Sequence, residues 1–152
     1  MKNLALPKRR DVLKAAAFAA AVPFASRVSW AAASPMQTLQ YAAVAVAGRG
    51  AADIGSMSRH EKIRVVAGAD VDANALENFS KQRKDARTFS DWREMLDKMG
   101  DSIDVVSVST PDHMHGIISM SAMNMKKHVY VQKPLAQNIG ECRAMLASAQ
   151  RN

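Results

Sequence analysis

Hydrophobic and polar residues alternate along the chain in a pattern typical of β-strands separated by α-helices. Short apolar or β-branched runs are each followed by a longer stretch in which apolar residues recur at helical spacing. The expected strands are residues 41–46, 63–69, 87–89, 103–109 and 129–131. The expected helices are residues 51–59, 73–83, 92–99, 114–125 and 139–149. This order predicts an α/β protein with a doubly wound parallel sheet and helices on both faces.

Three of these segments show how the pattern assigns burial. Helix 92–99 is expected to begin after Ser90 as its N-cap and to bury an apolar stripe of Trp92, Met95, Leu96 and Met99. Residues 103–109 are nearly all apolar and β-branched, as expected for a strand that is buried on both faces. Residues 129–131 form a short apolar run that we also expect to be buried, and Pro134 ends it because proline lacks a ladder donor.

The N-terminal 33 residues have the layout of a secretory signal. An arginine pair, Arg9-Arg10, precedes an apolar run at residues 15–25 and a small-residue cleavage site at residues 31–33. We expect a twin-arginine signal peptide at residues 1–33, a linker at 34–39 and one domain at 40–152. The apolar run is too short to serve as a stable membrane anchor. This predicts a periplasmic or secreted bacterial protein, and the alternative is a retained N-terminal helix.

Composition supports no nucleic-acid partner once the leader is set aside. The net charge of the chain is +7, but residues 1–33 hold six of the 21 basic residues and one of the 14 acidic ones. The remaining 15 basic and 13 acidic residues give a net charge of only +2. A basic surface for nucleic acid therefore has no basis in the mature segment. Cys142 is the only cysteine, so no intramolecular disulfide can form.

A glycine-rich turn follows the first expected strand. Backbone N–H groups at the start of the next helix can hold a pyrophosphate, which makes Ala47, Gly48, Arg49 and Gly50 candidates for cofactor binding. The dinucleotide fingerprint places glycine at the first, third and sixth positions of this turn, but Ala45 and Ala47 occupy the first two. Each added methyl is expected to weaken cofactor binding. The alternative is a plain strand–helix connection.

Asp70 ends the second strand, twenty residues after Gly50. A carboxylate at this place accepts hydrogen bonds from an adenosine ribose and repels a 2′-phosphate. We therefore expect NAD as the cofactor, with NADP disfavoured.

The ends of the fourth and fifth strands carry the remaining candidates. Thr110-Pro111-Asp112-His113-Met114-His115 closes the fourth strand, and Gln132-Lys133-Pro134 closes the fifth. Ligands bind outside the carboxyl ends of parallel strands, so Lys133 is expected beside the Thr110–His115 loop. Asp112 is the alternative N-cap of the following helix. Two histidines without a third ligand do not predict a metal site.

With these residues in place, the chain resembles the Gfo/Idh/MocA family of NAD(P)-dependent oxidoreductases, especially its exported bacterial members. The resemblance extends over residues 40–152. Five motifs carry it: residues 48–50, 70–72, 89–96, 110–115 and 132–134. In the family a Glu-Lys-Pro motif places its lysine in the active site, which maps onto Lys133, with Gln132 in place of the glutamate. We take Lys133 and His115 as catalytic candidates. Thr110, Pro111, His113, Gln132 and Lys133 join Ala47–Gly50 and Asp70 as cofactor-binding candidates.

The resemblance implies a Rossmann domain of an exported oxidoreductase that transfers hydride between a nicotinamide cofactor and a sugar or polyol. Family members add a second α/β domain that forms most of the carbohydrate site, whereas this chain ends after a helix. We therefore expect a truncated chain that is inactive alone, with a sheet incomplete at its C-terminal end, an exposed edge and self-association. Two alternatives remain: a vestigial or binding-only fragment, and a parent that is an NAD-dependent glycosidase.

Overall fold

The computed structural model describes residues 38–152. The expected signal peptide at residues 1–33 and the linker residues 34–37 lie outside the described residues. The first strand begins at Leu39, so the last expected linker residue is already part of the sheet.

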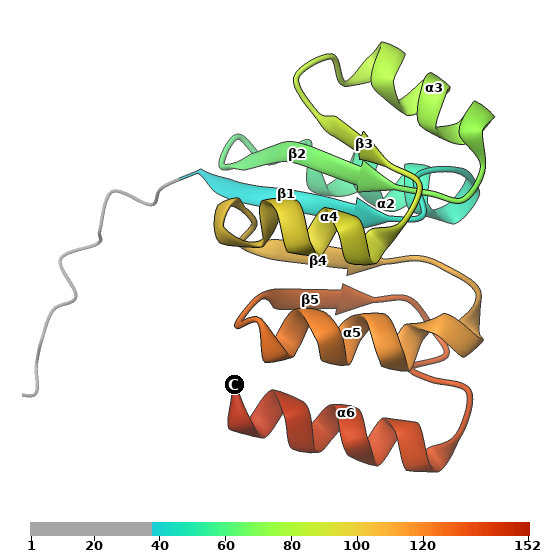
Figure 1. The fold of residues 1–152 in the computed structure, drawn as a ribbon, viewed down its shortest axis with the longest axis vertical. Coiled ribbons are helices and arrows are strands. Elements are labelled where there is room, and N and C mark those ends of the chain that lie inside the picture. The colour runs from blue at the N-terminus through green and yellow to red at the C-terminus, as the bar shows by residue number, and fades with distance from the viewer. Residues whose placement is uncertain (1–37) are drawn as a thin grey trace, which may run out of the picture. The chain divides into compact units, whose positions relative to one another are not determined.

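Five parallel strands and the helices between them make up the described part of the chain (Figure 1). The strands are β1 (Leu39–Val44), β2 (Ile63–Ala69), β3 (Arg87–Phe89), β4 (Val105–Val108) and β5 (His128–Val131). The α-helices are α2 (Gly48–Met57), α3 (Ala73–Gln82), α4 (Trp92–Met99), α5 (His115–Asn124) and α6 (Ile139–Arg151). Two 3₁₀ turns, η1 (Gly100–Ser102) and η2 (Asp112–Met114), precede β4 and α5.

The strand order is β3-β2-β1-β4-β5, which confirms the doubly wound arrangement. The chain runs outward from β1 to β3, then crosses back to β4 on the other side of β1. β1 pairs in parallel with both β2 and β4, so the order reverses between β1 and β4. Ligands bind at such a reversal because the two connecting helices leave on opposite faces and open a crevice at the strand ends.

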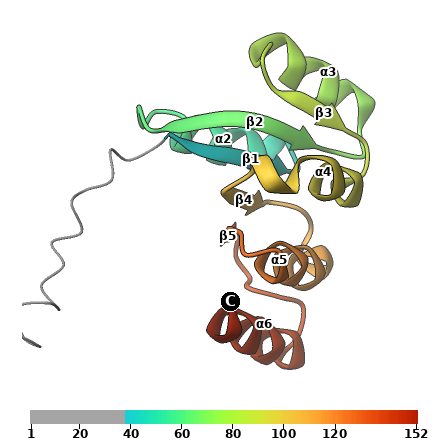
Figure 2. The ribbon, with the colours of Figure 1, turned by 60° about the vertical axis from the view of Figure 1, so that its left-hand side comes forward.

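Side chains of successive strand residues enter two different cores. On one face Ala42 and Val44 of β1 pack with Val106 and Val108 of β4 beneath α4 and α5. On the other face Tyr41 packs beneath α2 and α3. Figures 1 and 2 show α4 and α5 on one side of the sheet and α2 on the other. Successive side chains of a strand point to opposite faces of the sheet, which is why neighbouring residues of β1 belong to different cores.

Most expected elements are found with small shifts at their ends. β2, β3 and α4 have the expected bounds; Met95, Leu96 and Met99 of the α4 stripe are buried in the core, and Trp92 is partly buried against it. β1 ends at Val44 rather than at residue 46 because Ala45 turns the chain with a φ of 71°. Gly48 then opens α2 three residues before the expected start.

Two expected helix caps are wrong. The N-cap of α4 is Asp91, whose side chain accepts a hydrogen bond from the backbone N–H of Arg93, and not Ser90. Asp112 begins η2 instead of capping α5, and the residue before α5 is Met114, which makes no side-chain cap. At α4 the carboxylate of Asp91, one residue after Ser90, reaches the free N–H of Arg93. The carboxylate of Asp112 accepts instead from the N–H of His113, within the 3₁₀ turn that precedes α5.

The expectation that residues 129–131 form a buried strand is also wrong, since Val129 and Val131 are only half-buried and Tyr130 is exposed. β5 pairs only with β4 and forms an edge of the sheet. Val129 and Val131 face the core under α5, whereas Tyr130 points to the other face and is 39% exposed. The last helix, α6, packs beside α5 and leaves that face of β5 open (Figures 1 and 2).

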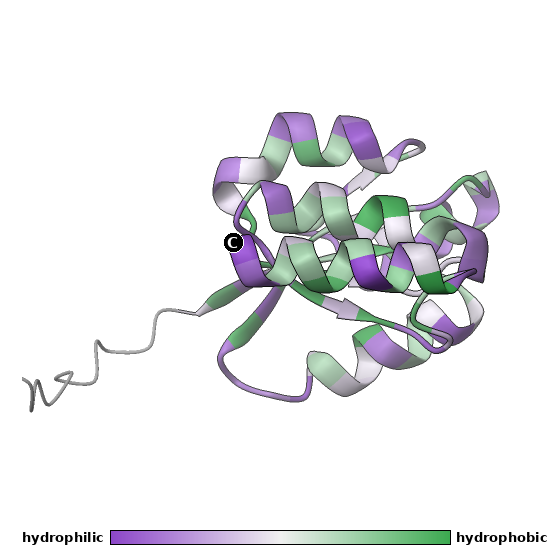
Figure 3. Ribbon diagram, turned by 90° about the horizontal axis from the view of Figure 1, so that it is seen from below, coloured by the Kyte–Doolittle hydropathy of each residue, from purple (hydrophilic) through white to green (hydrophobic). Residues whose placement is uncertain are grey.

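The helices show hydrophilic and hydrophobic residues side by side along each ribbon (Figure 3). Such banding is expected where a helix has one buried face. Within residues 38–152, no helix is both long and apolar enough to cross a bilayer.

Candidate functional site

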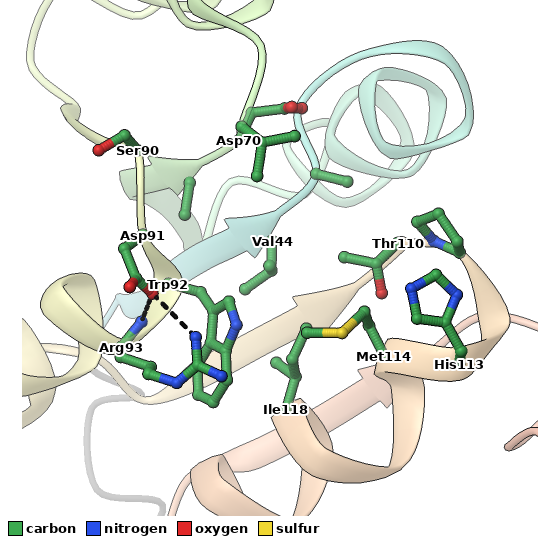
Figure 4. A pocket seen from close by; sticks show the side chains of 14 residues that line it. Val44, Asp70, Ser90, Asp91, Trp92, Arg93, Thr110, His113, Met114 and Ile118 are labelled. Atoms are coloured by element: carbon green, nitrogen blue, oxygen red, sulfur yellow. Dashed lines mark hydrogen bonds and ion pairs between the residues drawn. The ribbon is translucent and has the colours of Figure 1, made fainter.

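A cavity of about 440 Å³ lies at the carboxyl ends of the strands (Figure 4). It is bounded by the residues that follow β1, β2, β3 and β4, so it spans the point where the strand order reverses. The expected cofactor-binding residues Asp70, Thr110, Pro111 and His113 all line it. The sheet therefore brings Asp70 together with three residues of the β4 loop that lie at least 40 positions later in the sequence.

The turn from β1 into α2 borders this cavity through Ala45. Ala45 has a φ of 71° and Gly48 a φ of 53°, so the turn uses the left-handed region twice. Gly50 is buried, and a Cβ atom built on it would lie 2.0 Å from the carbonyl oxygen of Ala45. Only glycine therefore lets α2 approach the end of β1 so closely. Ala47 and Arg49 are exposed at the start of the helix.

The N-terminus of α2 is open to an acceptor from outside. Ala47, its N-cap, makes no side-chain hydrogen bond, and the first turn holds no acidic residue. A Cβ built on Gly48 would meet no atom within 4 Å. The first backbone N–H groups of a helix lack intrahelical acceptors and carry a partial positive charge, so this end favours an anion.

Asp70 joins the end of β2 to this turn. One carboxylate oxygen accepts a hydrogen bond from the backbone N–H of Val46 at 2.9 Å, and the other accepts one from the N–H of Asp72 at 3.1 Å. The carboxylate thus fixes the glycine-rich turn while it lines the cavity. Each oxygen has a further lone pair available for a ligand hydroxyl.

The loop after β3 contributes an aromatic and a cationic side chain. The guanidinium of Arg93 lies 4.4 Å from the centre of the Trp92 ring and 3.5 Å from a carboxylate oxygen of Asp91. All three residues line the cavity, and Figure 4 shows Trp92 and Arg93 facing Met114 and Ile118 across it. A planar aromatic ring paired with a guanidinium suits an aromatic or phosphorylated ligand.

The loop after β4 supplies Thr110, Pro111 and His113 to the cavity, but His115 lies elsewhere. His115 is only 1% exposed, and its Nδ1 and Nε2 atoms lie 2.7 Å from the carbonyl oxygen of Pro134 and 2.8 Å from that of Thr110. Both ring nitrogens are thus engaged with backbone carbonyl oxygens. His115 ties the β4 loop to the corner after β5. Its catalytic role stays a prediction.

Lys133 follows β5 at the same edge of the sheet and is exposed. The pairing of Val108 with Val131 sets Thr110 and Lys133 the same distance beyond the last paired residues of β4 and β5. Neither Lys133 nor Gln132 lines the cavity described above. They stand beside it, on the far side of the Thr110 loop, and their roles also stay predictions.

Asp53 is a residue of this region that the sequence pattern did not single out. It lies on α2, is 6% exposed, and its carboxylate accepts hydrogen bonds from Gln132 and Ser109. Trp92 and Arg93 were predicted only as a helix stripe and a family motif. The position of Trp92 and Arg93 after β3 could have indicated that they line the cavity, since the carboxyl ends of parallel strands share one edge of the sheet. For Asp53 the sequence holds no such signal, because no regular spacing relates it to Gln132.

The residues present fit a dinucleotide. An uncapped helix N-terminus beside a carboxylate-lined cavity offers one site for a pyrophosphate and one for a ribose. The hydroxyl oxygen of Thr110 is buried without a hydrogen-bond partner among the described residues. No cluster of three His, Cys, Asp or Glu side chains that could hold a metal ion occurs within residues 38–152.

Comparison with known proteins agrees with this geometry. The family described as "Oxidoreductase family, NAD-binding Rossmann fold" (Gfo/Idh/MocA) matches residues 39–152. A 1-carboxy-3-chloro-3,4-dihydroxycyclohexa-1,5-diene dehydrogenase of Comamonas testosteroni is 36% identical over 59% of this chain and 22% of its own. A levoglucosan dehydrogenase of Pseudarthrobacter phenanthrenivorans is 33% identical over 55% and 20%. An alpha-N-acetylgalactosaminidase of Shewanella oneidensis is 34% identical over 51% and 17%.

Solved structures share the fold. The myo-inositol 2-dehydrogenase of Lactobacillus plantarum superposes with a TM-score of 0.70 at 22% identity, over 76% of this chain and 34% of that chain. The WlbA dehydrogenase of Bordetella pertussis, solved with NADH and UDP-GlcNAcA, gives a TM-score of 0.70 at 21% identity, over 76% and 35%. The chain thus spans about a fifth of the length of the curated relatives and about a third of these structures.

Proposed function

This chain belongs to the Gfo/Idh/MocA family of oxidoreductases with an NAD-binding Rossmann fold, and we propose that it serves hydride transfer between a nicotinamide cofactor and a sugar or polyol. The dehydrogenases among its relatives support the reaction type, and the levoglucosan enzyme supports a carbohydrate-like substrate. In this proposal residues 40–152 are the cofactor-binding part of the enzyme.

The proposal rests on one observation: the cavity at the strand reversal reaches the turn before α2 through Ala45, and the start of α2 is uncapped, although residues 47–50 do not themselves line the cavity. The backbone N–H groups of residues 48–50 would hold the pyrophosphate, because the first N–H groups of a helix lack intrahelical acceptors and carry partial positive charge. Asp70 would accept hydrogen bonds from a ribose. Thr110, Pro111 and His113 would line the same dinucleotide from the other side of the reversal.

Lys133 would act on the hydroxyl that is oxidised. When bound, a nicotinamide ring supplies the acceptor for hydride. A hydroxyl that becomes a carbonyl must also lose its proton, and an ammonium group beside the oxygen stabilises the developing negative charge. An exposed lysine at the end of β5 is free to do this at the sheet edge where the cofactor residues gather.

We further propose NAD rather than NADP as the cofactor. The Asp70 carboxylate is negative and lines the cavity, so it repels a 2′-phosphate. In an Asp70→Asn variant the ratio of NADPH to NADH affinity should rise about tenfold, since the charge is removed while the amide oxygen still accepts. Titration with both dinucleotides measures this ratio. An unchanged ratio would show that the Asp70 charge does not set the preference.

Titration of the purified chain with NADH tests the proposed function directly. Saturable binding supports it, and absence of binding favours a vestigial fragment whose turn has lost its glycines.

Ala47 is exposed at the place where glycine is expected, so an Ala47→Gly variant should bind NADH about threefold more tightly or better. Ala51→Gly, one turn further along α2, is the matched control and should leave NADH affinity unchanged. Weaker binding by Ala47→Gly would contradict the assigned role of the turn.

A glycosidase parent is the second candidate function. The alpha-N-acetylgalactosaminidase relative is 34% identical to this chain over 82 residues, an identity between those of the two dehydrogenases, 36% and 33%. A glycosidase of this family would hydrolyse an aryl glycoside without net reduction of NAD. Assays of a full-length relative for both products distinguish the two reactions.

We also propose export through the twin-arginine route. The Arg9-Arg10 pair and the apolar and small residues that follow it support this. Such a route suits a protein that takes up its cofactor before export. Fusion of residues 1–33 to a reporter, with Arg9→Lys and Arg10→Lys as the blocked control, tests the proposal by the location of the reporter.

A further inference from the structure

Asp53 is a buried carboxylate that the proposed function does not use. It lies on the inner face of α2 and is 6% exposed, which is rare for aspartate because burial of an unpaired charge is costly. Its partners come from three places in the chain. Their convergence on one carboxylate needs an explanation beyond the stability of α2.

Gln132 makes the most specific of these contacts. Its side-chain amide Nε2 donates to both carboxylate oxygens of Asp53, at 3.0 and 2.9 Å. The other end of the same amide, Oε1, accepts a hydrogen bond from the backbone N–H of Lys133 at 3.3 Å. The orientation of the amide that precedes Lys133 is thus fixed by a charge on a different element.

Two more contacts extend the set toward the cofactor residues. The hydroxyl of Ser109, at the end of β4, donates to Asp53 at 2.8 Å. The guanidinium Nε of Arg49, in the first turn of α2, lies 3.4 Å from Asp53. One carboxylate therefore joins the start of the cofactor helix, the end of β4 and the residue before Lys133.

We propose that Asp53 is a positioning residue that sets Lys133 in register with the dinucleotide-binding turn, an inference that rests on the proposed function. Asp53 acts through Gln132 and touches neither cofactor nor substrate. His115 supports the other side of the same corner through its contact with the carbonyl oxygen of Pro134. Lys133 is thereby held between two buried side chains from helices on opposite faces of the sheet.

The contact between Asp53 and Gln132 can be tested by exchanging which of the two side chains carries the charge. In Asp53→Asn the aspartate charge is lost and one oxygen becomes an N–H donor, which faces the donors of Gln132 and Ser109. In Gln132→Glu two carboxylates face each other and repel. In the double variant Asp53→Asn/Gln132→Glu, the new amide donates to the new carboxylate, so the contact is restored with its polarity reversed.

The readout compares NADH with ADP-ribose, which lacks the nicotinamide ring. Each single variant should lose about tenfold in the ratio of NADH to ADP-ribose affinity, because a hydrogen bond to a charged group near Lys133 is weakened while the adenosine side is untouched. The double variant should regain most of this ratio. Asp97→Asn, an exposed aspartate on α4, is the matched control and should bind both ligands as wild type does.

Equal losses for both ligands, or a double variant worse than either single one, would overturn the proposal, since Asp53 would then act through general stability. Absence of binding of both ligands to the wild type would refute the proposed function instead. Hydrogen exchange of the Lys133 backbone amide then decides the inference alone. It should be about tenfold faster in each single variant, restored in the double one and unchanged in Asp97→Asn. An unchanged rate in Asp53→Asn would refute the positioning role.

Discussion

At the scale of single residues, Ala45 stands out because it holds a backbone conformation that glycine adopts more readily. Its φ of 71° crowds the Cβ atom against the neighbouring backbone. The position is nevertheless fixed, since its N–H donates to the carbonyl oxygen of Ala69 at 2.8 Å and its own carbonyl group abuts Gly50. The turn thus retains the geometry of a glycine turn without its first glycine.

An Ala45→Gly substitution should stabilise the protein despite the greater freedom of glycine in the unfolded chain. Removing the steric strain of alanine at a left-handed φ outweighs the extra conformational entropy that glycine gives the unfolded chain. The net gain in the free energy of unfolding should be about 0.5–1 kcal/mol. Thermal unfolding should shift upward by a few degrees. Ala51→Gly, within α2, is the opposite control and should destabilise by about 0.5–1 kcal/mol. A lower Tm for Ala45→Gly would contradict the strain assigned to this residue.

Tyr41 gives the fold a pH dependence in alkaline solution. Burial raises the pKa of its hydroxyl from 10.0 to about 12, while the hydrogen bond to Ser107 lowers it and nearby Asp53 and Tyr130 raise it. Below pH 10 the group is neutral in both states. Between pH 10 and 12 only the unfolded state ionises, so stability is lost as the pH rises, by roughly 2–3 kcal/mol in total.

Chemical denaturation from pH 9 to pH 12 measures this loss. A Tyr41→Phe variant is less stable at pH 9, because it leaves Ser107 without its partner, but its stability should fall less steeply above pH 10. Parallel curves for the two proteins would show that Tyr41 does not ionise differently on unfolding.

At the scale of elements, the approach of α2 to β1 depends on Gly50. A methyl group there would lie 2.0 Å from the Ala45 carbonyl oxygen, and backbone cannot move aside as a flexible side chain does. Gly50→Ala should therefore cost about 2–4 kcal/mol in the free energy of unfolding and weaken NADH binding, because the helix start shifts. Gly55→Ala, on the same helix with no atom within 4 Å of the added carbon, is the control and should be neutral or stabilising. A tolerated Gly50→Ala would refute the close approach.

The elements themselves were largely predictable from local pattern. The alternation of strands and helices and the bounds of β2, β3 and α4 follow from apolar runs and helical spacing. The ends of β1 and the caps were not, because each depends on one backbone angle or on which of two neighbouring side chains reaches an N–H. The meeting of Asp53, Ser109 and Gln132 lay beyond any local pattern, since it arises only when the helix docks on the folded sheet.

At the scale of the whole molecule, the unpaired edge of β5 predicts that copies of the protein associate with one another. β5 is an edge strand, and Tyr130 and Leu135 beside it are among the exposed apolar residues of the described chain. Unpaired backbone groups at such an edge can pair with another chain. We expect the purified protein to elute larger than a monomer, and Tyr130→Lys to shift it toward the monomer. Ile117→Lys, on α5, is the control and should not. A monodisperse wild-type monomer would contradict this prediction.

The position of Trp92 in the cavity wall makes its fluorescence sensitive to a bound dinucleotide. The chain has two tryptophans, and Trp92 lines the cavity between Asp91 and Arg93. A Trp30→Phe variant would leave its indole as the only one, and reduced nicotinamide absorbs the light that indole emits. Occupation of the cavity should therefore quench this fluorescence by energy transfer, which gives the protein a built-in optical probe of dinucleotide binding that needs no label and no substrate.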